Sequence, residues 1–284
     1  MKWNNFFCPG LVATGLLMTG IIGCSAVGDK PPLPGLMTSL DGASMVLIPA
    51  GNFLMGEEAA EGQTTTNVQH RVYLDAYYID QFEVTTRLYH EFLKDRNRVE
   101  PEDWPEYWNE EVPLRHPMKP VVGVSWEDAQ AFCLSYGKRL PTEAEWEKAA
   151  RGMKGALYPW GGEAPDLRRA NFTRCCDFRE YDVLTAVGSF EEGRSPYGLY
   201  DMAGNVWEWV AGCLYEPSCL RSPVRNPPGP VTGDQKVIRG GSWGSPAEAL
   251  RTSNRFGYYP ENGDDYIGFR CVQDVHRDDP VPTG

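Results

Sequence analysis

Histidine and cationic residues are scarce in this chain of 284 residues. It has four histidines, and its 27 Lys and Arg face 39 Asp and Glu, which gives a formal net charge of −12. Four histidines without metal-ligand spacing argue against a histidine-rich metal centre. An excess of acid repels phosphate, so we expect no nucleic-acid partner and no electrostatic attraction to an anionic membrane surface. An apolar share of 42% and an aromatic share of 12% argue against wholesale disorder.

The chain also lacks an apolar run of the length that a membrane-spanning helix needs, about 20 residues. Its longest such run, residues 11–22, follows Lys2 and precedes Gly23-Cys24. A positive residue and then a short apolar stretch are typical of a secretory signal. The ending resembles the bacterial lipoprotein box, which implies cleavage before Cys24 and a lipid on that cysteine. The alternative is a short N-terminal anchor helix followed by a chance cysteine.

The lipoprotein interpretation divides the chain into four parts. We expect a lipoprotein signal peptide over 1–23, a lipidated tether over 24–43, one folded domain over 44–275 and a C-terminal tail over 276–284. The prolines of the second part favour an extended chain. Ser25 after the lipid-bearing cysteine resembles the outer-membrane sorting pattern of Gram-negative lipoproteins. The expected location is therefore the outer membrane, reached through the lipid, with the domain facing the periplasm or the cell surface.

Six cysteines remain after Cys24 in the expected exported protein. An even number in an oxidising compartment favours disulfides, although spacing alone does not choose their pairing. A soft-metal site built from four of them is the alternative, and these are Cys175, Cys176, Cys213 and Cys219. The other two are Cys133 and Cys271.

The domain has few long regular elements. Ser125 is a predicted N-cap, and Thr142 with Glu145 forms a predicted capping box, in which each residue satisfies a backbone amide of the other. A third helix begins at Thr85 or Thr86, and the chain beyond Gly152 is mostly loop. The predicted helices are 85–93, 125–136 and 142–151, and the predicted strands are 45–51, 72–79, 237–240 and 268–271.

Eight motifs in order resemble the sulfatase-modifying factor family, which includes the formylglycine-generating enzymes. They are residues 45–56, 83–85, 124–129, 137–147, 158–161, 198–209, 239–243 and 268–271. The resemblance implies an α+β domain with the formylglycine-generating-enzyme fold, an elaborated C-type-lectin-like architecture with little regular secondary structure. That expectation agrees with the many loops predicted from the residues themselves.

The resemblance also implies a copper centre that this chain lacks. Active family members hold Cu(I) with two cysteines, five positions apart, after a Gly-Gly-Ser-aromatic motif. Those two positions are Ser245 and Leu250 here. A soft ion such as Cu(I) prefers thiolate ligands, and neither residue provides one. We therefore expect no copper and no copper-dependent formation of formylglycine.

Calcium is the cofactor that the resemblance implies instead, in a structural role. Carboxylate and carbonyl oxygens are its usual ligands. The implied site is Asp201, Gly204, Val206 and Glu208. A weaker second site begins with Asn171 and Phe172, and its carboxylate stays open among Asp177, Glu180 and Asp182. The alternative is that these carboxylates bind loop amides without an ion.

Two further predictions concern a disulfide, which the resemblance implies, and a binding groove, which the Trp-rich segments suggest. The resemblance pairs Cys133 with Cys271. Groove candidates for a peptide or glycan are Ser242, Trp243, Trp207 and Arg251. Buried tryptophans that pack the loops are the alternative for most of the Trp residues. Arg251, together with Arg239, Arg255 and Arg270, is alternatively an internal salt-bridge partner.

The residues favour a lipid-anchored binding or scaffold module of the cell envelope, with an unknown peptide, protein or glycan as ligand. A diverged periplasmic oxidase or maturation enzyme is the alternative. The resemblance includes family members that oxidise a peptide-siderophore precursor in the periplasm without the cysteine pair. Sulfatase activation ranks lowest. An enzyme is expected to have a deep cleft at Ser242, Trp243 and Ser245 with convergent polar groups, whereas a binding module can have that region filled.

Overall fold

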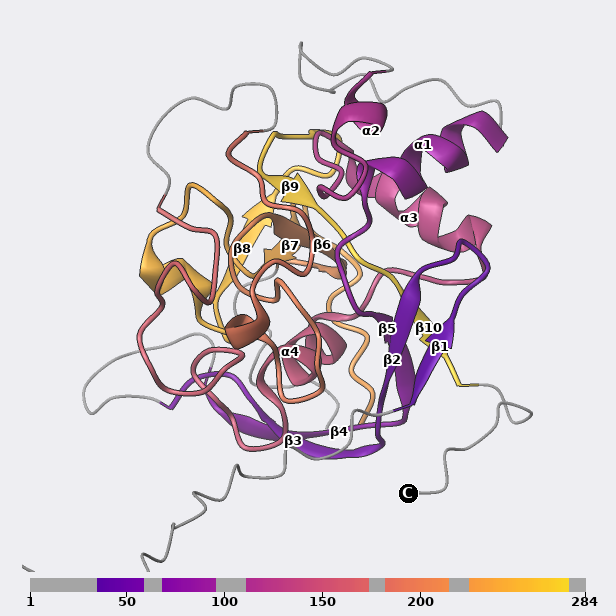
Figure 1. The fold of residues 1–284 in the computed structure, drawn as a ribbon. Helices are drawn as coiled ribbons and strands as arrows, with labels where there is room; N and C mark the ends of the chain where they lie inside the picture. Colours follow the sequence, from indigo (N-terminus) through magenta and orange to yellow (C-terminus); the bar gives the residue numbers. More distant parts are fainter. Residues whose placement is uncertain (1–34, 59–67, 96–110, 174–181, 215–224, 276–284) are drawn as a thin grey trace, which may run out of the picture. The chain divides into compact units, whose positions relative to one another are not determined.

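The computed structural model describes residues 35–58, 68–95, 111–173, 182–214 and 225–275 (Figure 1). The predicted signal peptide, Cys24, the cysteines 175, 176 and 219, and the tail 276–284 lie outside these ranges. Within them, no helix has the length and apolar character needed to cross a membrane. The strands are β1 Leu36–Thr38, β2 Ser44–Ile48, β3 Gly51–Met55, β4 His70–Leu74, β5 Tyr77–Asp80, β6 Trp207–Cys213, β7 Lys236–Arg239, β8 Arg255–Tyr258, β9 Ile267–Gly268 and β10 Val272–Asp274. The helices are α1 Thr86–Asp95, α2 Val112–Arg115, α3 Trp126–Ser135, α4 Glu143–Arg151, and two 3-10 turns, Glu191–Gly193 and Ala247–Leu250.

A four-stranded antiparallel sheet joins the first and last strands of the domain, in the order β1-β2-β5-β10. Val46 of β2 lies opposite Ile79 of β5, and Ile79 lies opposite Val272 of β10. β1 pairs with β2 through a tight turn, so regular structure begins before residue 44, inside the segment expected to be tether. The N-terminal strand is therefore part of the domain.

The predicted strand 72–79 is two strands that belong to different sheets. β4 pairs with β3 in a hairpin, whereas β5 pairs with β2 and β10. The chain breaks at Asp75, whose backbone N–H donates to Asn226 Oδ1 at 2.9 Å and whose carboxylate accepts from Asn226 and Arg225. The expectation of one strand was wrong because side chains from residues 225–226, far away in sequence, bind the backbone and carboxylate at the break.

A second four-stranded sheet, in the order β8-β7-β6-β9, forms the C-terminal half of the core. β6 runs antiparallel to β7 and parallel to β9. The predicted strand 268–271 was also wrong: β9 ends at Gly268 in this sheet, and β10 begins at Val272 in the first sheet. The residues between them therefore carry the chain from one sheet to the other.

Three helices cover one side of the core, where α1, α2 and α3 group together (Figure 1). Leu88 N–H donates to Thr85 Oγ1 at the start of α1, and Asp128 N–H donates to Ser125 Oγ at the start of α3, so both predicted caps are confirmed. The two helices pack through aromatic rings, with Phe92 and Phe132 5.2 Å apart between ring centroids. The structure joins Cys133 of α3 to Cys271 by a disulfide, the pair that the family resemblance implies.

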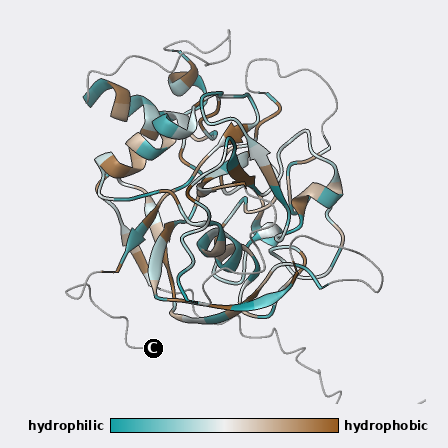
Figure 2. Cartoon of the chain, turned by 180° about the vertical axis from the view of Figure 1, so that it is seen from behind, coloured by the Kyte–Doolittle hydropathy of each residue, from teal (hydrophilic) through white to brown (hydrophobic). Residues whose placement is uncertain are grey.

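Helix α4 is buried along its whole length although most of its side chains are polar or charged. Its predicted capping box is confirmed, since Thr142 and Glu145 each bind the other's backbone amide. Figure 2 shows the short helix at the centre with hydrophilic teal stretches between browner ones. A charged helix is buried at little cost only if every charge finds a partner. Those partners are mainly Arg239 of β7 and Arg255 of β8 for the acidic residues, and backbone carbonyls of residues 49 and 51 for Lys148.

Candidate functional site

The two serines of the Gly-Gly-Ser segment are buried and bind each other. Ser245 Oγ accepts a hydrogen bond from the backbone N–H of Ser242 at 2.9 Å and lies 3.2 Å from Ser242 Oγ. Thr173 N–H donates to the carbonyl of Ser245 at 3.0 Å. The hydroxyl at the first copper position is therefore engaged within its own loop.

Leu250, at the second copper position, is the last residue of the 3-10 turn Ala247–Leu250 and has no exposed surface. It packs in an apolar cluster with Tyr158, Ala170, Phe172 and Ala203. A Cβ added at Gly241 would lie 2.9 Å from Leu250 Cδ1, so the leucine fills the space beside the glycine motif. The position that the family resemblance assigns to the second thiolate therefore holds a packed hydrocarbon side chain.

Cys213 does not replace the missing thiolates. It is buried, forms no disulfide to another cysteine in the described part of the chain, and is the last residue of the seven-residue strand β6. Trp207, beside the glycine motif, is the first residue of β6, so the two ends lie about 20 Å apart. The remaining described cysteines, Cys133 and Cys271, are bonded to each other.

The groove candidates pack against the protein more than they open to solvent. Trp207 is buried, and its ring centroid lies 6.2 Å from that of the exposed Phe256. Trp243 is half-buried against the same core, and its indole N–H donates to the carbonyl of Asp265 at 3.3 Å. Arg251 is also half-buried. The two tryptophans thus mainly pack this region, as the alternative interpretation expected.

A buried cluster of three carboxylates, Glu83, Asp201 and Glu208, lies next to Trp207. Glu208 accepts from Arg270 through both oxygens, at 2.7 and 2.8 Å, and its Oε2 also accepts from the indole N–H of Trp146 at 2.8 Å. Glu83 accepts from Asn205 Nδ2 at 2.7 Å and from the backbone of residue 206 at 3.3 Å. Sequence reasoning did not assign Glu83 to this cluster, although it lies in one of the eight motifs.

Charge in this cluster is unbalanced, because three carboxylates face the single guanidinium of Arg270. Burial, together with the charges of Asp201 and Glu208, raises the pKa of Glu83 well above its ordinary value. Burial also raises the pKa of Asp201 to about 6. The backbone N–H of Gly188, which donates to Asp201 Oδ2 at 2.7 Å, acts in the opposite direction and lowers this pKa. A proton or a cation would relieve the excess negative charge.

The predicted calcium ligands lie in and beside this cluster. Asp201 has a left-handed backbone with φ 58°, in the turn that leads through Gly204 to Val206 and Glu208. The residues fit a cation in charge, but both oxygens of Glu208 already accept from Arg270, so a Ca²⁺ ion would share or displace that contact. In the described residues, no group of three or more His, Cys, Asp and Glu forms a metal cluster. The predicted site has only two carboxylates and adds two backbone carbonyls, so the absence of such a group does not test it. The first calcium site stays a prediction.

The second predicted calcium site is built differently. Asn171 uses its side-chain N–H₂ to donate to Val183 O at 2.8 Å and to Asn205 Oδ1 at 3.1 Å, and Phe172 is buried nearby. Of the three candidate carboxylates, Asp182 is exposed, and residues 177 and 180 lie outside the described ranges. This site also stays a prediction.

Arginines of the motif segments are internal ion-pair partners, as the alternative interpretation expected. Arg239 binds Glu143 at 3.1 Å and Glu147 at 2.6 Å, and Arg255 binds Glu143 at 2.8 Å. Arg239 also donates to the carbonyls of residues 252 and 253. Helix α4 thereby fixes the strand that leads into the Gly-Gly-Ser segment.

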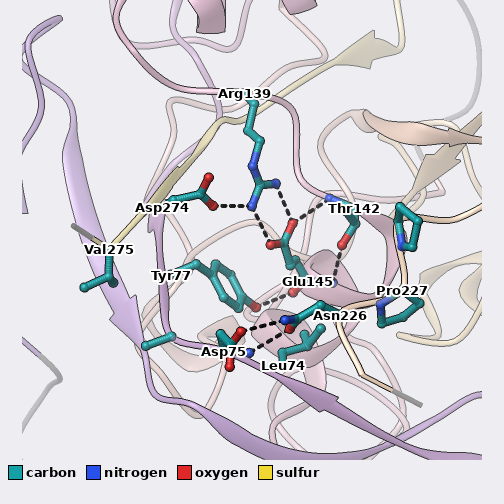
Figure 3. Close-up of a pocket in the computed structure, with 12 residues that line it drawn as sticks. Leu74, Asp75, Tyr77, Arg139, Thr142, Glu145, Asn226, Pro227, Asp274 and Val275 are labelled. Atoms are coloured by element: carbon teal, nitrogen blue, oxygen red, sulfur yellow. Dashed lines mark hydrogen bonds and ion pairs between the residues drawn. The ribbon is translucent and has the colours of Figure 1, made fainter. Parts of the chain in front are cut away.

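A cavity of about 390 Å³ lies at the N-terminal end of α4 (Figure 3). Arg139 crosses it, binding both oxygens of Glu145 at 2.7 and 2.8 Å and Asp274 Oδ1 at 2.6 Å. Asp75 and Asn226 form the opposite wall, and prolines 227 and 228 complete it. The lining residues carry three carboxylates against the guanidinium of Arg139 and are net acidic, and Arg225, outside the lining, pairs with Asp75. A second cavity, of about 160 Å³, is lined by residues near Phe82 and Leu88, and neither cavity is lined by Ser242, Trp243 or Ser245.

The architecture is that of an α+β domain with the formylglycine-generating-enzyme fold. Residues 33–275 match the sulfatase-modifying factor enzyme 1-like domain, and the chain belongs to this family. It is 33% identical to the inactive C-alpha-formylglycine-generating enzyme 2 of Mus musculus, over 82% of this chain and 87% of that protein. It is 31% identical to the formylglycine-generating enzyme of Streptomyces coelicolor, over 81% and 89%. The solved structure of PvdO from Pseudomonas aeruginosa has a TM-score of 0.70 and 26% identity, over 86% of this chain and 99% of that one.

Proposed function

We propose that this protein is a non-catalytic binding module of the bacterial cell envelope, held at the outer membrane by a lipid on Cys24. The observation that carries the proposal is the content of the two copper positions. Ser245 is hydrogen-bonded within its loop and Leu250 is packed in an apolar cluster. The family relative named as an inactive formylglycine-generating enzyme supports the same interpretation, since the fold can exist without the activity.

The net-acidic cavity beside Arg139 is the region that we propose for ligand contact. Its volume of about 390 Å³ lies in the range of small-ligand pockets. Asp274 exposes 66% of its side chain and Asp75 exposes 55%, so both carboxylates remain accessible to an incoming group. A cationic side chain of a peptide or protein ligand suits this lining better than an anionic one.

The absence of catalysis is tested with purified protein, Cu(I), dioxygen, a thiol reductant and a peptide that carries the cysteine motif of a sulfatase. We expect the peptide mass to stay unchanged, while an active formylglycine-generating enzyme converts it under the same conditions. Conversion that needs Ser245, and that disappears in Ser245→Ala, would overturn the proposal.

Ligand contact at the cavity is tested by calorimetric titration with a lysine tripeptide and, as its opposite, a glutamate tripeptide. We expect the lysine peptide to bind more tightly, and Asp274→Asn to weaken it. The matched control Asp166→Asn removes an exposed carboxylate outside the cavity lining. Equal binding of both peptides, or no effect of Asp274→Asn, counts against this site.

Lipid anchoring is tested by labelling cells with a clickable fatty acid and separating their membranes. We expect the label on the wild-type chain and its loss in Cys24→Ser, with release of the protein from the outer-membrane fraction. An unlabelled wild-type chain would remove the anchor from the proposal and leave the binding module untouched.

A further inference from the structure

A lysine and two aspartates meet beside the turn between β1 and β2, and their side chains have almost no exposed surface. Lys138 Nζ binds Asp41 Oδ2 and lies 3.1 and 3.2 Å from the two oxygens of Asp80. The Lys138 side chain is fully buried, and each aspartate side chain exposes 1%. Asp41 lies in the turn between β1 and β2, Asp80 ends β5, and Lys138 follows α3. Three segments far apart in sequence therefore bring an amine and two carboxyl groups together.

The carboxyl group of Asp41 is held at both oxygens. Ser39 Oγ donates to Asp41 Oδ1, and Ala43 N–H donates to the same oxygen at 3.1 Å. The other oxygen, Oδ2, faces Lys138 Nζ. Two donors on one oxygen and an amine beside the other are the arrangement that stabilises charge when a nucleophile adds to a carboxyl carbon. The phenyl ring of Phe132, 5.8 Å from Lys138 Nζ, adds an apolar wall.

The second carboxyl group is suited to carry a proton. Burial raises the pKa of Asp80, and the charge of Asp41 adds to this, while Lys138 and the backbone N–H of Cys271 oppose it. Burial also acts on Asp41, but Lys138, Ser39 and Ala43 outweigh it and lower the pKa of Asp41. The two aspartates beside one lysine thus differ in proton affinity, and Asp80 is the better proton acceptor.

We propose that Lys138 and Asp41 form an intramolecular isopeptide bond, with Asp80 as the group that transfers a proton. Lys138 Nζ gives up two protons, one directly to Asp41 Oδ2 and one to Asp80. The amine nitrogen bonds to Asp41 Cγ while Oδ1 is held by Ser39 and Ala43. Asp80 then returns its proton to the departing Oδ2, the Cγ–Oδ2 bond breaks, and one water molecule leaves. No oxidant, reductant or other reactant enters the balance.

Two physical arguments favour the reaction in this place. Fixed geometry raises the effective concentration of amine and carboxyl by many orders of magnitude, to about 10⁵–10⁸ M in well-oriented intramolecular cases. Burying a charged amine and a charged carboxylate costs free energy, and an amide replaces both charges with a neutral group. The bond would close a loop between residues separated by 97 positions and tie the β1–β2 turn to the segment after α3.

The test is mass spectrometry of the purified full-length chain under denaturing and reducing conditions. We expect its mass to fall short of the mass of the Asp41→Ala variant, corrected for the substitution, by one water molecule. Trypsin should fail to cleave after Lys138, and one branched peptide should join the Asp41 segment to the Lys138 segment. Cleavage after Lys138, with a linear Asp41 peptide of unaltered mass, would overturn the proposal.

The role of Asp80 is tested separately with Asp80→Asn, which keeps the lysine and the Asp41 carboxyl. We expect uncross-linked chain in this variant and a full cross-link in the control Asp234→Asn, whose residue is exposed and lies outside the triad. Peptide mapping of the wild-type chain decides whether the bond exists, independently of how well any variant folds. A complete cross-link in Asp80→Asn would overturn proton transfer by Asp80.

Discussion

Arg239 and Glu147 form an ion pair of 2.6 Å in the interior, and neither side chain has any exposed surface. Arg239 ends β7, directly before the Gly-Gly-Ser segment, and Glu147 lies at the middle of α4. The pair therefore sets the position of the loop that carries Ser242 and Ser245. Buried charges on α4 and β7 thus hold this segment in place.

Glu147→Gln should destabilise the domain strongly. Glu147 also binds Arg151 at 2.6 Å and accepts from the backbone N–H of Gly56 at 2.7 Å, so a neutral side chain leaves two buried guanidinium groups short of a counter-charge. Removing one partner of a buried pair costs about 3–5 kcal/mol. Urea unfolding followed by circular dichroism measures the loss. Asp166→Asn, in a surface pair with Arg168, is the control and should change stability far less, because exposed ion pairs contribute little. Equal losses would contradict the role of the buried pair.

Restoring the two cysteines should create a Cu(I) site. We expect the Ser245→Cys, Leu250→Cys double variant to bind one equivalent of Cu(I) in competition with a chromogenic chelator, and the wild type to bind none there. Leu250→Ala is the matched control, because it creates a similar void without a thiolate and should cost about 2–5 kcal/mol of stability. Tight Cu(I) binding by the wild type would show that ligands other than residues 245 and 250 hold copper.

Stability should rise at alkaline pH through Lys148. Burial lowers the pKa of Lys148 from 10.5 to about 8, while its Nζ donates to the carbonyls of Pro49 and Gly51. Between these two pH values the unfolded chain binds more protons than the folded one, so raising the pH favours the folded state, by at most about 1.4 kcal/mol per pH unit. The melting temperature of Lys148→Met, which lacks this titration, is the reference. A constant difference between the two proteins from pH 8 to 10 would contradict the prediction.

Calcium should stabilise the loop around Asp201. A ligand that binds only the folded state at 100 times its dissociation constant adds about 2.7 kcal/mol. We expect the melting temperature of chelator-treated protein to rise with Ca²⁺, and this rise to vanish in Asp201→Gly, where glycine tolerates the backbone φ of 58°. Asp201→Asn keeps an oxygen ligand and should retain the response. Identical melting curves with and without Ca²⁺ would contradict the calcium assignment.

Local signals in the sequence predicted the helices, whereas contacts between distant segments made the predicted strands 72–79 and 268–271 wrong. Thr142 and Glu145 form their capping box within one turn, so four residues suffice to predict it. The break at Asp75 depends on side chains about 150 positions away, which no local pattern reveals. For the site, the family resemblance alone predicted that Ser245 and Leu250 stand at the copper-ligand positions. It did not reveal that Glu208 is bound by Arg270 and Trp146, because that arrangement depends on the tertiary fold.

The buried charges of α4 also constrain how the domain comes apart. Glu147 needs the end of β3, Lys148 needs the turn between β2 and β3, and Glu143 needs arginines from β7 and β8. If any one of these sheets detaches, a buried charge of α4 loses a hydrogen-bond partner or a counter-charge. Partly folded states therefore have a higher free energy than both the folded and the unfolded state. We expect the domain to unfold in a single all-or-none transition, in which loss of β3 and loss of β8 cannot be separated.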